Sequence, residues 1–128
     1  MSARAEQIRE AIEIGPLEVL PQEHLARIKG RALMLSIREL QLLIELARQP
    51  DRIMERGELF RRAWGREMRL GDRSVDVYVR RLRVKLERAL PGWSFIHTHF
   101  GFGYRLAPER APAPAERSQP SDRTFTTQ

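Results

Sequence analysis

Apolar residues that recur at helical spacing divide residues 72–89 into two different faces. At about 100° per residue, one face collects Val75, Val79, Leu82 and Leu86, which predicts a helix that buries this side. The opposite face carries mainly cations and small apolar side chains: Arg73, Val77, Arg80, Arg81 and Val84, with Ser74 and Arg88 at its margin. A solvated face usually mixes acids and bases, but the only carboxylate within residues 73–86 is Asp76.

This composition suits the major groove of DNA. An arginine can donate two hydrogen bonds to guanine O6 and N7, and a valine methyl can meet the methyl group of thymine. The alternative is a basic surface helix that binds no partner.

Short apolar runs separated by turn residues occupy the chain upstream. The runs cover residues 12–14, 17–20, 25–28 and 31–35, with glycine or proline between most of them. Such a pattern predicts an antiparallel meander of small strands.

Two helices are predicted between this meander and the basic helix. Ser36 and Glu39 have the spacing of a capping box, and residues 40–47 behind them are apolar on much of the helix circumference. This helix should therefore lie at the centre of the core, and Pro50 ends it.

The second helix is expected at residues 55–64, with Gly65 closing it. A loop follows at residues 66–72, in which Asp72 is the expected N-cap of the basic helix.

The C-terminal part reads as a β-hairpin and a tail. Residues 94–100 and 104–106 are strand-like runs around a glycine-bearing turn. From residue 107 onward, prolines among small and charged residues cannot bury enough apolar surface to fold. The expected organisation is a leader or linker at 1–11, a domain at 12–106 and a disordered tail at 107–128.

The order of sheet, three helices and hairpin indicates an α+β winged helix-turn-helix domain. A formal net charge of +6 and a sequence pI near 10.9 favour a polyanionic partner. No apolar run reaches membrane-spanning length and no signal peptide is evident, so a soluble cytoplasmic protein without a membrane partner is expected.

Catalytic and metal-binding classes find little support. The chain has no cysteine, and His97 and His99 share a strand without a third ligand at motif spacing. The glycines at 101 and 103 lack the further glycine and the helix of a nucleotide site. Neither an enzyme nor a cofactor is predicted.

Five segments resemble the OmpR/PhoB-type winged-helix domain. They are residues 14–17 (IGPL), 35–40 (LSIREL), 63–65 (AWG), 73–83 (RSVDVYVRRLR) and 101–106 (GFGYRL). The resemblance extends over about residues 12–106. It implies a DNA-binding output domain of bacterial transcription regulators, usually two-component response regulators. It also implies a four-stranded N-terminal sheet, a recognition helix at 73–89 in the major groove of double-stranded DNA, and a hairpin wing in the adjacent minor groove.

The same resemblance implies roles for individual residues. Arg81 and Val77 match groove-facing positions, and Trp64, Thr98 and Tyr104 match positions that contact the DNA backbone. The remaining expected DNA contacts on the helix and wing are Arg73, Ser74, Arg80, Arg83, Val84, Lys85, His99 and Phe100. Four phosphate contacts, from Arg73, Arg80, Arg83 and Lys85, would give a slope of log affinity against log salt of about −4. The loop at 65–72 would meet RNA polymerase, through its sigma or alpha subunit, and a tandem dimer on DNA is also expected.

Several alternatives stay open. Trp64 and Tyr104 could instead be core aromatics whose polar tips are satisfied locally. Asp76 lies at i,i+4 to Arg80 and is expected to orient that guanidinium. Glu55 stands where the family usually has a serine or threonine cap.

Phe100 replaces an arginine that is frequent in the family. It could pack inward, wedge at a base step or meet a protein, and strand alternation with Ile96 favours inward packing. Because a phenylalanine has no charge and no donor, the wing is expected to add little A·T selectivity and to leave specificity mainly to the recognition helix. No receiver module lies upstream of residue 12 in this chain, so either an output domain separated from its receiver or a stand-alone regulator fits. The second functional reading is a protein-interaction adaptor for RNA polymerase with weak or non-specific DNA binding.

Overall fold

A small antiparallel sheet opens the domain in the computed structural model, which describes residues 10–111. Its strands follow the chain in the order β1-β2-β3-β4: β1 (Ile12–Ile14), β2 (Leu17–Leu20), β3 (Leu25–Ile28) and β4 (Arg31–Ala32). A short 3-10 helix at Pro21–Glu23 links β2 to β3. The predicted four-stranded meander is confirmed, but β4 has two residues instead of five. The chain leaves the sheet after Ala32, so Leu33 and Leu35 pack half-buried against the core while Met34 is exposed.

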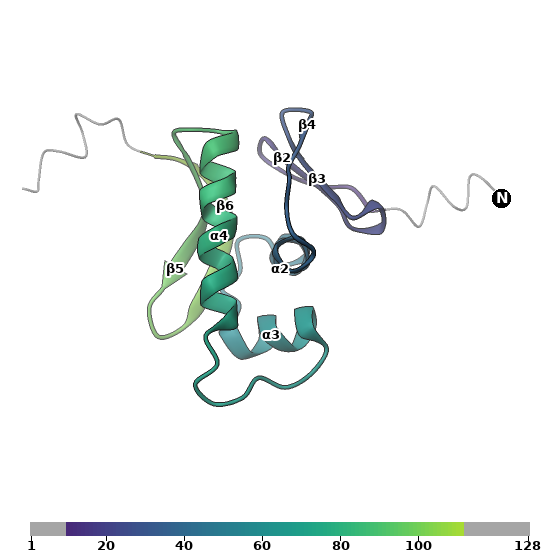
Figure 1. The fold of residues 1–128 in the computed structure, drawn as a ribbon. Coiled ribbons are helices and arrows are strands. Elements are labelled where there is room, and N and C mark those ends of the chain that lie inside the picture. The colour runs from purple at the N-terminus through teal and green to yellow at the C-terminus, as the bar shows by residue number, and fades with distance from the viewer. Residues whose placement is uncertain (1–9, 112–128) are drawn as a thin grey trace, which may run out of the picture.

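Helix α2 (Ile37–Arg48) begins at the predicted capping box. The Glu39 amide donates to Ser36 Oγ at 3.2 Å, and the Ser36 amide donates to Glu39 Oε1 at 2.8 Å. In Figure 1, α2 is seen end-on between the N-terminal sheet and α4. This central position explains why apolar residues surround most of the helix.

Helices α3 (Arg56–Trp64) and α4 (Ser74–Ala89) follow. Gly65 closes α3 with a φ of 78°, as expected of a helix C-cap. The N-cap position of α4 is Arg73, not the predicted Asp72. Asp72 nevertheless serves this helix start, because its Oδ1 accepts the Ser74 amide at 2.7 Å. Asp72 lies one residue before the N-cap position.

Strands β5 (Trp93–His99) and β6 (Gly103–Arg110) form the predicted hairpin. Strand β6 continues four residues past the expected domain end at 106, so residues 107–110 are not part of a disordered tail. Ala107 is buried there, and the Ala111 amide donates to Gly92 O, which continues the pairing. Residues 1–9 and 112–128, with the rest of the expected leader and tail, lie outside the described residues. Glu10, expected in the leader, pairs with Arg48 at 2.8 Å.

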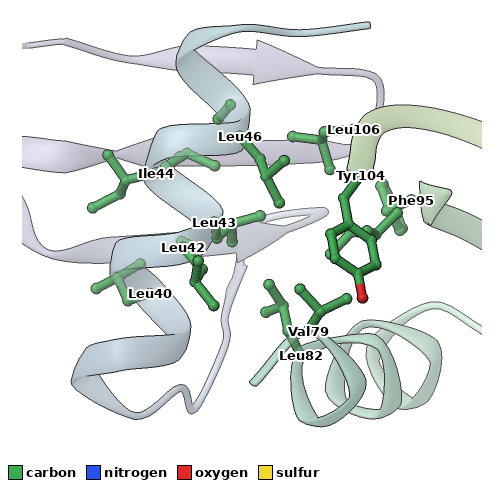
Figure 2. Packing of buried hydrophobic residues seen from close by; sticks show 14 of the residues in the cluster. Leu40, Leu42, Leu43, Ile44, Leu46, Val79, Leu82, Phe95, Tyr104 and Leu106 are labelled. Carbon is green, nitrogen blue, oxygen red and sulfur yellow. The ribbon is translucent and has the colours of Figure 1, made fainter. Parts of the chain in front are cut away.

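One apolar core joins strands β1 to β3, the three α-helices and the hairpin. Side chains of α2 meet the sheet on one side and α4 with the hairpin on the other, as Figure 2 shows for Leu42, Leu43 and Leu46. Val79 and Leu82 enter the same core from α4, and Leu106 enters it from β6. The core therefore fixes α4 against the hairpin and leaves one face of the helix outside.

Candidate nucleic-acid interface

The two faces predicted for α4 are present in the structure. The buried side chains are the four predicted ones, Val75, Val79, Leu82 and Leu86. The exposed face carries Arg73, Val77, Arg80, Arg81, Val84 and Arg88, with one exposed acid, Glu87, at its edge. Val77 and Val84 are 43% and 44% exposed, so two valines do stand among arginines on the outer surface.

Several cations on this face are free to bind an external anion. Within residues 10–111, Arg80, Arg81 and Arg88 make no ion pair or hydrogen bond with a carboxylate. The Arg81 guanidinium lies 5.2 Å from the centroid of the Tyr78 ring, which supports the side chain while its hydrogen-bond donors stay in solvent. The Arg73 side chain is 75% exposed and reaches Asp76 only at 3.5 Å.

Arg83, by contrast, is engaged within the domain. Its Nε donates to Ile96 O at 3.1 Å, and its Nη2 donates to the Thr98 hydroxyl. Burial lowers the pKa of this guanidinium. Arg83 thus fastens α4 to β5. Arg83 and Thr98 are both expected DNA contacts, but in the structure they are hydrogen-bonded to each other.

Lys85 is also tied down. Its Nζ donates at 2.7 Å to Glu39 Oε1, the same oxygen that accepts the Ser36 amide in the capping box. Burial by itself would raise the pKa of the Glu39 carboxyl, but the hydrogen bonds from Lys85 and Ser36 hold that pKa below its usual range. Lys85 therefore compensates a buried charge, and a phosphate would have to compete for it.

This pair predicts a pH-dependent contribution to stability. Because the pKa of Glu39 is lower in the folded state, the pair stabilises the fold fully at pH values above the ordinary pKa of a glutamate. This stabilisation is lost as the pH falls through the folded-state pKa of Glu39. Replacing Lys85 with Met should cost about 1–2 kcal/mol at neutral pH. Denaturant unfolding at several pH values should show the difference from wild type narrowing in acid. Arg88→Met, which removes an exposed cation from the same helix, should change little; equal effects of the two variants would contradict the assignment.

Asp76 has different partners from the predicted one. It does not orient Arg80; its Oδ2 pairs with Arg56 at 2.7 Å and with Arg73 at 3.5 Å, and its Oδ1 accepts the Tyr104 hydroxyl. Burial would raise the pKa of the Asp76 carboxyl, but hydrogen bonds from Tyr104 and Arg56 keep it below the usual range. The cross-element contacts outcompete the i,i+4 neighbour because β6 and α3 lie directly beside the first turn of α4.

The alternative of a locally satisfied aromatic holds for Tyr104. The residue is 8% exposed, and burial with the hydrogen bond to Asp76 raises its pKa to about 12. Figure 2 shows its hydroxyl directed toward α4. Trp64 is half-buried: it stacks on Phe60 with ring centroids 4.6 Å apart, and the Arg38 guanidinium lies 4.4 Å from its ring.

The wing tip differs from the prediction. Phe100 does not pack inward: it is 88% exposed, and Phe102 is 70% exposed. The expected alternation with Ile96 fails because β5 ends at His99, so Phe100 belongs to the turn and not to the strand. His99 is half-buried and its Nε2 accepts from Arg105 Nε at 3.0 Å.

A cleft of about 610 Å³ separates the wing tip from the starts of α3 and α4. Arg56, Arg73 and Asp76 line it from the helices, and residues 98–104 line it from the hairpin. It brings together Arg73, Thr98, His99, Phe100 and Tyr104, five of the expected site residues. Sequence reasoning missed Arg56, because its contact with Asp76 is formed across 20 residues and leaves no periodic signal.

Other sites find no support in the described part of the chain. His97 Nε2 lies 2.8 Å from Ala107 O, and no group of three potential metal ligands occurs among residues 10–111. None of the helices described there is long and apolar enough to cross a membrane.

Comparison with curated proteins finds regulators of transcription and sensory transduction. The sensory transduction protein RegX3 of Mycobacterium leprae is 35% identical over 95 residues, which cover 74% of this chain and 48% of that protein. The transcriptional regulatory protein AfsQ1 of Streptomyces coelicolor is 44% identical over 80 residues, covering 62% and 35%. The chain thus spans about half the length of such relatives, or less.

Solved structures match the whole fold. The DNA-binding domain of CpxR from E. coli superimposes with a TM-score of 0.69 at 26% identity, covering 77% of this chain and 96% of that domain. The Klebsiella pneumoniae RstA DNA-binding domain, solved in complex with the RstA box, gives a TM-score of 0.68 at 33% identity, covering 77% and 97%.

The family described as transcriptional regulatory protein, C terminal, matches residues 30–106. It comprises DNA-binding domains of transcription factors and not enzymes. On these matches, on the sheet–helices–hairpin order and on the exposed arginine face of α4, the chain belongs to the OmpR/PhoB-type family of winged-helix DNA-binding domains of response regulators.

Proposed function

We propose that this domain binds double-stranded DNA sequence-specifically for a bacterial transcription regulator, with α4 in the major groove and the β5–β6 wing at the adjacent minor groove. The observation that carries the proposal is the outer face of α4. It combines free guanidinium groups on Arg80, Arg81 and Arg88 with exposed methyl groups on Val77 and Val84. Such a face offers both phosphate contacts and base-edge contacts.

The related RstA domain was solved with the RstA box, and the AdeR DNA-binding domain, 27% identical with a TM-score of 0.62, was solved with an intercistronic region. Those complexes support a DNA partner for this chain. Selection of bound sequences from random duplexes is the direct test. If no preferred sequence is recovered, the proposal of sequence-specific binding is contradicted.

The salt dependence of binding follows from which cations are free. Because Arg83 and Lys85 are engaged internally, phosphate contacts are assigned to Arg73, Arg80 and Arg88 in place of the original four. The slope of log affinity against log salt should then be about −3. Fluorescence titrations of one duplex between low and moderate salt measure this slope.

Two variants distinguish free from engaged cations in that titration. Arg80→Ala should make the slope shallower by about 0.9, because one counterion-releasing contact is lost. Lys85→Met should leave the slope unchanged while it lowers stability. A slope near zero for the wild type would rule out DNA as the partner.

A contact with RNA polymerase is assigned to the loop between α3 and α4. In this loop Leu70 is fully exposed, whereas Met68 packs partly buried against the core, so the loop is anchored and still presents an apolar side chain. Leu70→Asp should leave DNA affinity intact and reduce binding to isolated sigma or alpha subunits. Unchanged subunit binding would remove this loop from the proposal.

The exposed Leu70 also favours the second candidate, an adaptor that binds RNA polymerase and holds DNA weakly. The adaptor would be favoured if the affinity for the selected and scrambled duplexes were equal and weak while the affinity for the polymerase subunits were high. A tandem dimer is tested in the same experiments by the stoichiometry on duplexes that carry one or two copies of the selected site.

A further inference from the structure

Two phenylalanines at the tip of the wing are exposed to an extent that is unusual for aromatic side chains. Phe100 is 88% exposed and Phe102 is 70% exposed, while within residues 10–111 every other phenylalanine is buried. They belong to neither the core nor the surface of a strand. Two adjacent solvent-exposed rings at the end of a projecting hairpin indicate a contact with a partner.

The turn fixes how these rings project. The Phe102 amide donates to His99 O at 2.8 Å, which closes a β-turn over residues 99–102. Gly101 has a φ of 83°, the value that a type II turn needs at its third position. Phe100 and Phe102 therefore flank a glycine that has no side chain, and the tip presents two rings with a gap between them.

The hairpin is held in place close to its turn. The backbones of Met54 and Tyr104 exchange two hydrogen bonds, of 2.7 and 3.0 Å, which form an isolated β-bridge beside the start of β6. Arg83 fastens β5 to α4, and Tyr104 fastens β6 to Asp76. The rings are thus carried by a preorganised projection, which lowers the entropy cost of inserting them.

The surroundings of the tip favour DNA over a protein. In Figure 1 the hairpin tip lies beside the N-terminal end of α4, and the cleft between them is lined by Arg56 and Arg73. The two acids that line it, Glu55 and Asp76, balance these arginines, so the cationic charge that favours DNA lies on the adjoining outer face of α4, in Arg80, Arg81 and Arg88. A DNA duplex bound along the outer face of α4 would pass this tip. The rings would then meet the groove next to the one that α4 occupies.

We propose that Phe100 and Phe102 form an apolar wedge that enters the minor groove and partly unstacks one base step beside the site read by α4. This inference rests on the proposed DNA-binding function and adds to it a specificity determinant. Apolar wedges of this kind bend the duplex, and they favour pyrimidine–purine steps, which unstack most readily. The wing then selects deformable steps, in place of the narrow A·T grooves that an arginine would prefer.

The test uses duplexes that carry the selected major-groove sequence and 2-aminopurine at successive positions in the flanking half turn. Wild-type protein should raise the fluorescence at one step, because the base analogue brightens when it is unstacked. The double variant Phe100→Ala/Phe102→Ala should abolish this signal. It should also lose roughly tenfold or more in affinity when that step is pyrimidine–purine, since aromatic–base stacking is lost.

Two matched variants complete the design. Met34→Ala removes a side chain that is 85% exposed in the loop before α2, and it should change neither fluorescence nor affinity. Phe100→Arg should reduce the unstacking signal and shift the flanking preference toward A·T-rich sequence. Near-ultraviolet circular dichroism and melting confirm that each variant is folded.

The outcomes separate this inference from the proposed function. If the wild type binds its selected site but the double variant binds and unstacks DNA equally well, the wedge is wrong and the function stands. If the wild type has no sequence preference, the function itself fails. If the double variant changes the sedimentation of the protein without DNA, or its binding to polymerase subunits, while DNA binding is unchanged, the rings cover a protein surface and the wedge is overturned.

Discussion

Replacing Gly103 with Ala is expected to destabilise the domain more than any other single change at the wing. A Cβ built on Gly103 would lie 2.0 Å from Met54 O and 2.7 Å from the Met54 carbonyl carbon, which are backbone atoms that no side-chain rotation can move. The residue also has a φ of 142°, which L-residues rarely adopt. The two hydrogen bonds between Met54 and Tyr104 would have to break for the overlap to be relieved.

The expected cost is about 3–4 kcal/mol, in the range of substitutions that combine backbone strain with lost hydrogen bonds. For a domain of this size the melting temperature should fall by more than about 10 °C. Calorimetry or thermal circular dichroism measures this change. Because Tyr104 would also move away from Asp76, the variant should weaken DNA binding even below its melting temperature.

Gly101→Ala is the matched control, since Gly101 has a φ of 83° but nothing within 4 Å of its Cβ position. It should cost only about 1 kcal/mol, which is the conformational penalty alone. If both variants melt at the same temperature, close packing of Gly103 on Met54 does not hold the wing.

The two faces of α4 and the buried circumference of α2 could be predicted from sequence because helical periodicity is a local signal. Val75 and Leu82 face the core for the same reason that Arg81 faces outward: each position is set by 100° steps along one helix. The capping box at Ser36 and Glu39 is similarly local, since both hydrogen bonds span three residues. Such features depend little on the rest of the fold.

The partners of the charged residues could not be predicted in the same way. Arg83 donates to residues 13 and 15 positions away, Lys85 pairs with Glu39 across 46 positions, and Asp76 reaches β6 and α3. Periodicity indicates that a side chain is near the surface but not which distant carboxylate or carbonyl lies beside it. The sequence therefore suggested more free cations on α4 than the structure contains.

The fate of Phe100 was missed for a related reason. Strand alternation is reliable only inside a strand, and the end of β5 at His99 depends on where the turn closes. Two glycines, at 101 and 103, allow several registers of the turn, and one residue of difference moves Phe100 from the inner face to solvent.

Replacing Arg81 with Ala should cost about 1–3 kcal/mol of binding free energy on the preferred site and relax specificity at one base pair. Arg81 is the candidate for this role because its guanidinium is exposed in the middle of the outer face of α4. The Tyr78 ring, 5.2 Å away, supports the side chain without using its donors. A planar guanidinium that is held in this way can donate two parallel hydrogen bonds to a guanine, and a flexible lysine cannot reproduce that geometry.

Three variants measured on selected and scrambled duplexes test this assignment. Arg81→Ala should lose affinity mainly on the selected duplex, whereas Arg80→Ala, which removes a neighbouring exposed cation, should lose similar affinity on both because phosphates carry no sequence information. Arg81→Lys should retain most of the affinity for scrambled DNA but not the preference for guanine. Equal losses on both duplexes for Arg81→Ala would make Arg81 a phosphate contact, and base reading would then have to come from elsewhere on the exposed face of α4, with the valines as the first candidates.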